Sequence, residues 1–180
     1  MTDTTAEIST LFLEFSRQKL LNQYWPSLRS CVESLTEDQI WWRPNASSNS
    51  VGNLMLHLNG NVTQWLVAPF QHLEDRRDRP AEFSLKNDIS RADLVADLEK
   101  TMADAASVFS SLSKAGLHAH YDIQGYHVTG LHAVYQVVEH FGLHYGQIAF
   151  ITKMLNGSDL AFYRELSGTG RAPKSGGYMP

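Results

Sequence analysis

The longest uninterrupted helical pattern in the chain is Thr129–Leu155, with the sequence TGLHAVYQVVEHFGLHYGQIAFITKML. It contains no proline, and its inward-facing side chains recur at steps of three and four residues, which is the spacing of one buried helix face. Thr129 is suited to cap the start of the helix, and Asn156-Gly157 supplies a left-handed cap at its end. We therefore expect one buried helix here, whose inner stripe is Leu131, Val134, Val138, Phe141, Tyr145, Ile148, Thr152 and Leu155.

Two histidines, His140 and His144, lie four residues apart within this helix. Four residues turn a helix through about 400° and advance it roughly 6 Å, so both imidazoles lie on one face and can bind one metal ion. A catalytic metal usually has three protein ligands and one position left for water or substrate. The third ligand must then come from elsewhere in the chain, and we expect it to be His57.

The bulk composition limits the classes of protein that this chain can be. Its length and its 43% of hydrophobic residues predict one globular domain over residues 1–180 with a single core. The formal charge of −4 argues against a nucleic-acid partner. The single cysteine, Cys31, excludes an intrachain disulfide framework and suits a reducing compartment. With no signal-peptide pattern and no run of about 18 apolar residues, we expect a cytoplasmic protein without a membrane partner.

Three further long helical patterns precede the one that begins at Thr129. The first covers about 5–35 and contains Pro26, which we expect to kink the helix or divide it in two. The second covers about 51–68 and follows a capping serine, Ser50; the third runs to about Leu112 from Ser90, which begins a capping-box pattern. Four long helices with two sizeable crossovers predict an all-α four-helix bundle.

The segments between these helices are expected to be short or irregular. Residues 36–39 begin a short helical turn with a capping box, and the charged segment 74–80 (EDRRDRP) is predicted to be a solvated loop. Residues 114–128 are interpreted as an irregular crossover with a short extended portion. The Gly/Pro-rich tail 167–180 is expected to be mobile or held by a partner.

The second helix is expected to direct His57 inward, because Leu54 and Leu58 flank it. With His140 and His144 it can form a three-histidine set around one divalent ion, and imidazole suits zinc, nickel, iron or copper. The competing interpretation is a set of hydrogen-bonded core histidines, since such spacings also arise by chance. Three buried imidazoles without a common partner would leave polar nitrogens unsatisfied, which favours the metal site.

Several polar residues follow the candidate ligands at helical spacings. Asn61, Gln64 and Gln147 are candidates for orienting a ligand or a metal-bound water, and the alternative is an ordinary polar residue at the edge of the core. Glu139 is a candidate general base, although a surface carboxylate is the simpler interpretation. Cys31 has no nearby group to activate it, so we expect a buried structural thiol.

Two stretches resemble the DinB/YfiT-like superfamily of metalloenzymes, and within it the DUF1572 branch. They are NSVGNLMLHLNGNVTQW (residues 49–65) and YQVVEHFGLHYGQIAFITKML (residues 135–155). The segments WWRPN (residues 41–45) and DRRDRPAEF (residues 75–83) match that branch as well. The resemblance extends from the first helix to about Tyr163.

This resemblance implies a bundle with up-down-down-up topology, often dimeric, that holds one divalent metal. The family's metal ligands correspond here to His57, His140 and His144. Family members with assigned activities include thiol-dependent transferases and isomerases that use bacillithiol, mycothiol or glutathione. The resemblance therefore implies a low-molecular-weight thiol as a co-substrate and a homodimeric assembly.

Together these observations predict a metal-dependent enzyme with a mononuclear three-histidine site that acts on a small molecule. The reaction would be hydrolysis or thiol-dependent transfer, with zinc, nickel or iron as the metal. The alternative is a non-catalytic, dimeric helical bundle with a binding or structural role.

Overall fold

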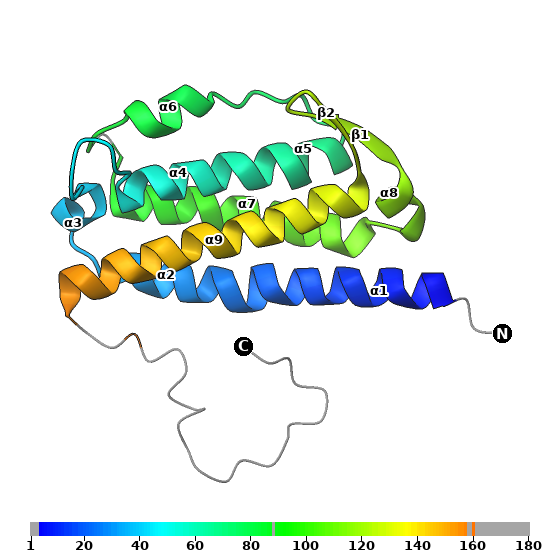
Figure 1. Ribbon diagram of the computed structural model, residues 1–180, viewed down its shortest axis with the longest axis horizontal. Coiled ribbons are helices and arrows are strands. Elements are labelled where there is room, and N and C mark those ends of the chain that lie inside the picture. The colour runs from blue at the N-terminus through cyan, green and yellow to red at the C-terminus, as the bar shows by residue number, and fades with distance from the viewer. Residues whose placement is uncertain (1–3, 88, 158–159, 161–180) are drawn as a thin grey trace, which may run out of the picture.

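The computed structural model describes residues 4–87, 89–157 and 160, so the tail 167–180 lies outside the described residues. In the described part the chain forms an all-α four-helix bundle with one short β-hairpin at one end (Figure 1). The predicted fold class is confirmed. No described helix is long and apolar enough to cross a membrane.

The first long helical segment is a rod of three parts, α1 (Thr4–Arg17), the π-helical η1 (Gln18–Tyr24) and α2 (Trp25–Glu33). Pro26 lies in the first turn of α2, directly after the π-helical turns. Because π-helical turns shift the backbone hydrogen-bond pattern, the absent N–H of the proline is accommodated where that pattern changes. The proline therefore divides the α-helix without ending the rod.

The second long segment repeats this arrangement. It consists of α4 (Val51–Val62), the π-helical η2 (Thr63–Val67) and the short α5 (Ala68–Phe70), which contains Pro69 in its first turn. Ser50 caps α4, and Asn53 closes the capping box with it.

The remaining helices begin where their capping residues predict. Thr36 and Gln39 form the capping box of α3 (Glu37–Trp41), and Ser90 caps α7 (Arg91–Ser111). Thr129 accepts a hydrogen bond from the backbone N–H of His132 at the start of α9 (Gly130–Asn156). Gly157 ends α9 in the left-handed conformation, with φ of 61°.

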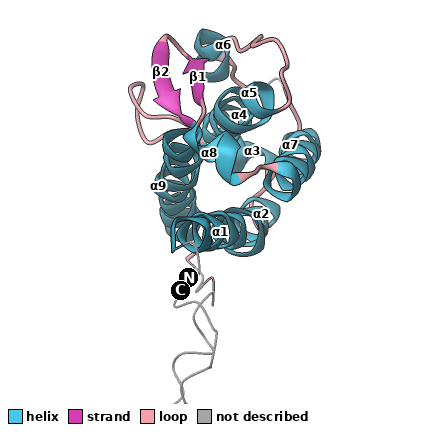
Figure 2. Ribbon diagram, turned by 90° about the vertical axis from the view of Figure 1, so that its right-hand side faces the viewer, coloured by secondary structure: helices cyan, strands magenta, loops and turns pink. Residues whose placement is uncertain are grey.

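The four long segments run up, down, down and up (Figure 1). The α1–α2 rod and α9 point one way, and α4 and α7 point the other way. In the end view of Figure 2 these segments surround one interior, with α4 between α7 and α9. The crossover from α5 to α7 carries α6 (Arg79–Ser84), which packs on the outside of α4. This crossover covers the part of α4 that bears His57.

The other crossover contains α8 (Lys114–His118) and a β-hairpin of β1 (His120–Ile123) and β2 (Tyr126–Thr129). The two turn residues have positive φ values, 54° at Gln124 and 82° at Gly125, as a tight type I′ hairpin requires. The sequence predicted only a short extended portion here. Each strand has four residues and buries one side chain, which is too little for an alternating pattern to be visible.

The core is one continuous cluster of apolar side chains contributed by all four long segments. Cys31 is fully buried within it, and burial raises the pKa of its thiol to about 11, as expected for a structural cysteine. The largest fully buried side chains include Leu20, Leu28, Leu35, Ile40, Met55, Leu58, Leu66, Leu98, Leu117, Phe141 and Ile148.

Part of the apolar pattern lies on the surface instead of in the core. Leu131 was expected on the buried face of α9, but its side chain is 43% exposed. Other large apolar residues of α1 and α9 are exposed as well, namely Ile8, Leu11, Phe15, Tyr135, Leu143, Phe150 and Met154. A helical period identifies an apolar stripe, but the stripe alone does not reveal whether the same chain covers it.

Candidate metal centre

The antiparallel packing of α4 and α9 brings three histidines together. The Nε2 atoms of His57 and His140 are 2.9 Å apart, and the ring centre of His144 lies 4.9 Å from that of His57 and 4.5 Å from that of His140. One candidate ligand atom from each ring lies within 4.8 Å of the others. Among the histidine, cysteine, aspartate and glutamate side chains of the described residues, these three histidines form the group that lies close enough together to share a metal ion.

The His57 ring is fixed by a carboxylate on its outer side. Its Nδ1–H donates to Oε2 of Glu82 at 2.8 Å, and both side chains are buried. An ionised carboxylate can only accept, so it places the proton of the imidazole on Nδ1 and leaves the Nε2 lone pair directed at His140. A carboxylate behind the imidazole is the usual arrangement for a histidine that binds a metal.

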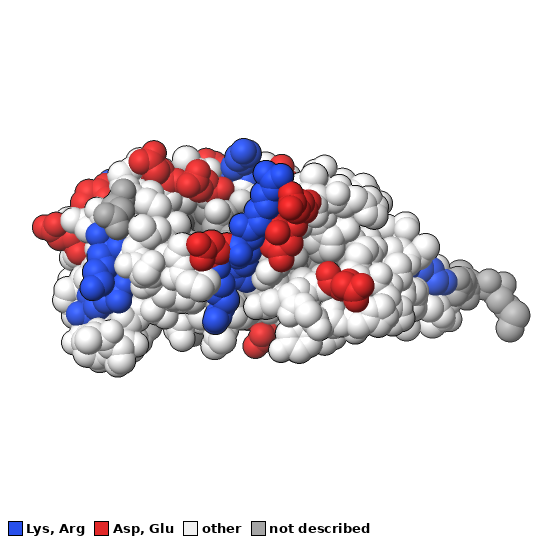
Figure 3. Space-filling model, turned by 90° about the horizontal axis from the view of Figure 1, so that it is seen from above, with Lys and Arg blue, Asp and Glu red and all other residues white. Residues whose placement is uncertain are grey.

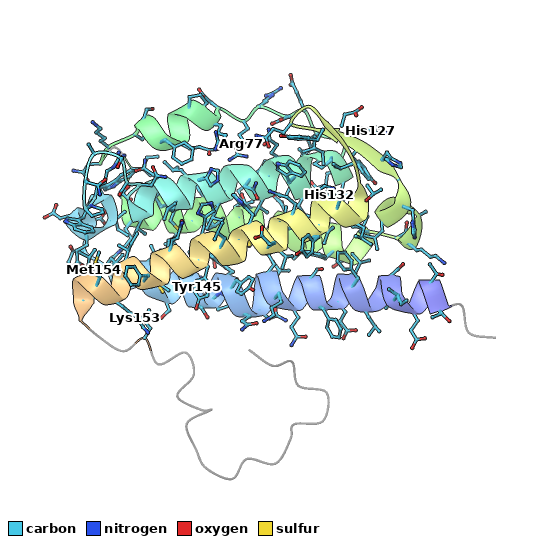
Figure 4. The ribbon with its side chains drawn as sticks, viewed as in Figure 1. Arg77, His127, His132, Tyr145, Lys153 and Met154 are labelled. Carbon is cyan, nitrogen blue, oxygen red and sulfur yellow. The ribbon has the colours of Figure 1, made fainter. Side chains whose placement is uncertain are left out.

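Arg77 holds this carboxylate from a segment that the sequence predicted to be a solvated loop. That prediction is wrong for Arg77, whose side chain is only 5% exposed. Its guanidinium donates to both carboxylate oxygens of Glu82, at 2.6 and 2.9 Å, and to Oε1 of Gln64 at 2.8 Å. Figure 4 shows Arg77 between α4 and the segment that crosses over it.

The charge of Glu82 is maintained by its partners in spite of burial. Burial acts to raise the pKa of its carboxyl group, but the hydrogen bonds from Arg77 and His57 outweigh that effect and hold the pKa below its usual range. The carboxylate therefore stays ionised at neutral pH and keeps its acceptor role toward His57.

Gly60 makes room for this ion pair on the surface of α4. A Cβ atom at Gly60 would overlap Oε1 of Glu82 and lie 2.8 Å from Nε of Arg77. Glycine disfavours helices, so its place near the end of α4, where the rod continues into η2, requires a reason. The close approach of Glu82 and Arg77 to the helix backbone provides it.

A second polar cluster anchors α6 on α4. The side-chain amide of Asn53 donates to the carbonyl oxygens of Glu82 and Leu85, at 2.9 and 3.1 Å. Its Oδ1 atom accepts from Arg43 at 2.6 Å and from the hydroxyl of Ser50 at 2.6 Å. Because Asn53 is one turn before His57 on α4, this cluster sets the position of Glu82 relative to His57.

The two histidines of α9 are half-buried and neutral at neutral pH. Burial lowers the pKa of His140 to about 4, and the proximity of His144 and His57 acts in the same direction. Burial also lowers the pKa of His144, whose Nδ1–H donates to Oε1 of Gln147 at 2.8 Å. The Nε2 lone pair of His144 is therefore free for a ligand.

This donor set fits a divalent metal ion. Two nitrogens bound to one tetrahedral zinc ion at 2.0–2.1 Å lie about 3.3 Å apart, close to the separation of 2.9 Å between His57 and His140. Neutral imidazoles suit zinc, nickel, iron or copper, and the Nδ1 atoms of His57 and His144 both face an acceptor oxygen.

The other residues singled out in the sequence differ in their relation to the cluster. Gln147 bonds to His144 directly, whereas Gln64 reaches His57 only through Arg77 and donates its own amide to Asp75. Asn61 is 3% exposed and makes no hydrogen bond to a histidine in the described part of the chain, and Glu139 is on the surface. A separate pair of histidines, His120 and His127, stacks in the hairpin.

The sequence argument missed Glu82 and Arg77. Two signals pointed to them, namely a glycine inside the second helical pattern (Gly60) and the resemblance of residues 75–83 to the family pattern. Neither signal identifies which charged residue is buried. The charge pattern does not single out the buried pair either. In the view from above, acidic and basic side chains alternate over the surface (Figure 3).

Comparisons with known proteins agree with this fold. The family model described as "Protein of unknown function (DUF1572)" matches residues 7–167. A solved structure described as a conserved protein from Enterococcus faecalis is 15% identical, with a TM-score of 0.68, and the match covers 81% of this chain and 97% of that one. No curated protein matches the sequence.

A second solved structure, described as a DinB-like protein from Bacillus cereus, is 12% identical with a TM-score of 0.61. The match covers 75% of this chain and 87% of the other. Identities this low show a shared fold and no more, whereas the family model covers most of the chain. The chain therefore belongs to the DUF1572 family.

Proposed function

We propose that His57, His140 and His144 hold one divalent metal ion and that the protein is a metal-dependent enzyme acting on a small molecule. The observation that carries this proposal is the convergence of His57 and His140, whose Nε2 atoms are 2.9 Å apart. Buried imidazoles without a shared partner are costly, and a metal ion removes that cost.

The chain's own residues prepare the ligands for such an ion. Glu82 holds the proton of His57 on Nδ1, Arg77 keeps Glu82 ionised, and Gln147 orients His144. A bound divalent ion would supply Lewis acidity and would lower the pKa of a coordinated water or thiol. Hydrolysis and transfer of a low-molecular-weight thiol both use that chemistry, and zinc, nickel or iron would serve.

The test is the metal content of protein purified without a polyhistidine tag, measured by plasma mass spectrometry. Wild type should hold close to one metal ion per chain, and His140→Ala should hold almost none. The matched control is His132→Ala, an exposed histidine on the same helix, which should retain the metal. Wild type without metal after incubation with zinc, nickel and iron would show that the proposal is wrong.

A second candidate is a dimeric bundle with a binding or structural role. Its support is the set of exposed apolar side chains on α1 and α9, which a second copy of the chain could cover. A thermal melt with and without a chelator separates the two candidates. A metal enzyme with an open coordination position should lose stability with the chelator and respond to small thiols, whereas an inert bundle should show neither response.

A further inference from the structure

Two amide oxygen atoms near the histidine cluster are buried without a hydrogen-bond partner, one on the buried Asn61 and one on the half-buried Gln136. Within the described residues, the buried polar side-chain atoms without a partner are Oδ1 of Asn61, Oε1 of Gln136 and Oγ1 of Thr152. Thr152 lies beside the Cys31 thiol. Thr152 is eight residues beyond His144 on α9, whereas Asn61 and Gln136 are each four residues from a histidine of the cluster.

Asn61 and Gln136 lie at the same level of the bundle. Asn61 follows His57 by four residues on α4, and Gln136 precedes His140 by four residues on α9. The two helices are antiparallel, and His57 meets His140 between them. One turn toward the C-terminus of α4 and one turn toward the N-terminus of α9 therefore reach the same height along the bundle. Asn61 and Gln136 lie at that height, roughly 6 Å along the axis from the histidines. α9 also packs against η2, beyond this level, so the helices stay together there.

The lack of partners at Asn61 contrasts with another asparagine on the same helix. Asn53 is fully buried and bonds to Ser50, Arg43 and the end of α6 through both ends of its amide. Asn61 is only 3% exposed, and its Oδ1 atom has no partner among the described residues. Burying an unpaired amide destabilises a protein, so a residue kept in that state needs a compensating role.

We propose that Asn61 and Gln136 bind the polar end of a small molecule whose other end reaches the histidine cluster. The unpartnered atoms are carbonyl oxygens, so that end must carry a hydrogen-bond donor, such as a hydroxyl, an amide N–H or an ammonium group. The ligand carries a metal-binding atom and this donor about one helical turn apart. This inference rests on the proposed metal site and adds the substrate feature that the site selects.

The first test measures the cost of the unpaired amide in the metal-free protein. Asn61→Leu removes a buried polar group without a partner and should raise Tm by a few degrees. Asn53→Leu, the matched control, removes a fully bonded amide from the same helix and should lower Tm. A fall in Tm for Asn61→Leu similar to that for Asn53→Leu would overturn the proposal, since Asn61 would then have a structural partner.

The second test measures recognition of the donor in the zinc-loaded protein by titration calorimetry. Mercaptopropanol and butanethiol both offer a thiolate to the metal, and only the first carries a hydroxyl. Wild type should bind mercaptopropanol about tenfold more tightly, as expected for one additional buried hydrogen bond. Asn61→Leu and Gln136→Leu should each lose this preference while keeping the zinc content of wild type. Equal affinities in wild type, or a preference that survives in both variants, would contradict the proposal.

The two proposals fail in different ways. Zinc content in wild type and His140→Ala reports on the histidines, whereas the ratio of the two thiol affinities reports on the amides. If wild type holds no zinc, the proposed enzyme function is wrong, and the Tm comparison of Asn61→Leu with Asn53→Leu decides the fate of the amide pair.

Discussion

At the scale of single residues, the site depends on where the histidine protons lie. Glu82 is the residue that sets this for His57, because an ionised carboxylate accepts and cannot donate. Gln147 contacts Nδ1 of His144 at 2.8 Å, but an amide can donate as well as accept, so it fixes the proton of His144 less strictly. Helical spacing pointed to His140 and His144, and the apolar neighbours of His57 together with the family resemblance pointed to the third histidine. The acceptor behind His57 was not predicted, because it comes from a crossover whose position depends on contacts far apart in the sequence.

Glu82→Gln tests the contribution of this carboxylate to metal affinity. The amide keeps the shape of the side chain but removes the charge that pairs with Arg77, and it can present an N–H to His57. We expect zinc affinity to fall by about 10–100-fold, measured by competition with a chelating dye. Glu74→Gln is the control, because Glu74 is an exposed partner of Arg76. Equal zinc affinity in both variants would exclude a role for Glu82.

Gly60 and Gly146 form a matched pair for testing how closely the crossover packs on α4. Gly60→Ala places a methyl group against Glu82 and Arg77 and should destabilise the protein by about 1–3 kcal/mol. A Cβ at Gly146 meets nothing within 4 Å, so Gly146→Ala should stabilise α9 by up to about 1 kcal/mol. Urea unfolding measures both changes. Stabilisation by both substitutions would mean that the ion pair does not lie against Gly60.

Acid should destabilise the metal-free protein through His140. Its folded-state pKa is about 4, below the ordinary value of 6.5, so the unfolded chain binds the proton more readily. The stability that this group contributes is therefore complete above pH 6.5 and is lost as the pH falls toward 4. After allowance for partial exposure, we expect a loss on the order of 1–2 kcal/mol.

Urea unfolding of wild type and His140→Asn between pH 7 and pH 4 checks this expectation. Both proteins retain Glu82, whose lowered pKa acts in the same direction, so the difference between them isolates His140. The variant should lose less stability on acidification than wild type. Parallel curves would show that His140 titrates in the folded protein as it does in the unfolded chain.

At the scale of elements, the sequence predicted what local signals determine. The caps at Thr36, Ser50, Ser90 and Thr129 and the left-handed end at Gly157 all lie within a few residues of the helices that they limit. The position of α6 could not be predicted in the same way. It depends on contacts between residues far apart in the chain, such as the hydrogen bond that His57 of α4 donates to Glu82, 25 residues later.

Asn53→Ala tests whether this anchor holds α6 in place. It removes the hydrogen bonds to the carbonyl oxygens of Glu82 and Leu85, so amide hydrogen exchange should become faster across residues 79–85 and remain unchanged in α9. Asn59→Ala is the control, because Asn59 bonds to Thr101 of α7 instead of α6. Slow exchange in α6 of the first variant would show that other contacts hold it.

At the scale of the whole molecule, the up-down-down-up order places the two histidine-bearing helices side by side although they are far apart in the sequence. The four helical patterns were sufficient to predict the bundle, and the resemblance implied the order of its helices. The hairpin and the π-helical turns were not predicted. The hairpin buries too few side chains to produce an alternating apolar pattern in the sequence. The π-helical turns change the backbone hydrogen bonds but leave the spacing of the apolar residues unchanged.

The exposed apolar residues of α1 and α9 belong to this scale too. The helical period does not distinguish a stripe that the chain covers itself from one that a second copy could cover. The homodimer therefore remains a proposal, and a sedimentation experiment on the purified chain would decide it.

The central claim is that three imidazoles share one metal ion, and anomalous diffraction at the metal absorption edge tests it most directly. Crystals of tag-free protein loaded with zinc should show one strong peak per chain, about 2.0–2.1 Å from the Nε2 atoms of His57, His140 and His144. A crystal without a peak between these rings, or with its only peak at the hairpin histidines His120 and His127, would contradict the account.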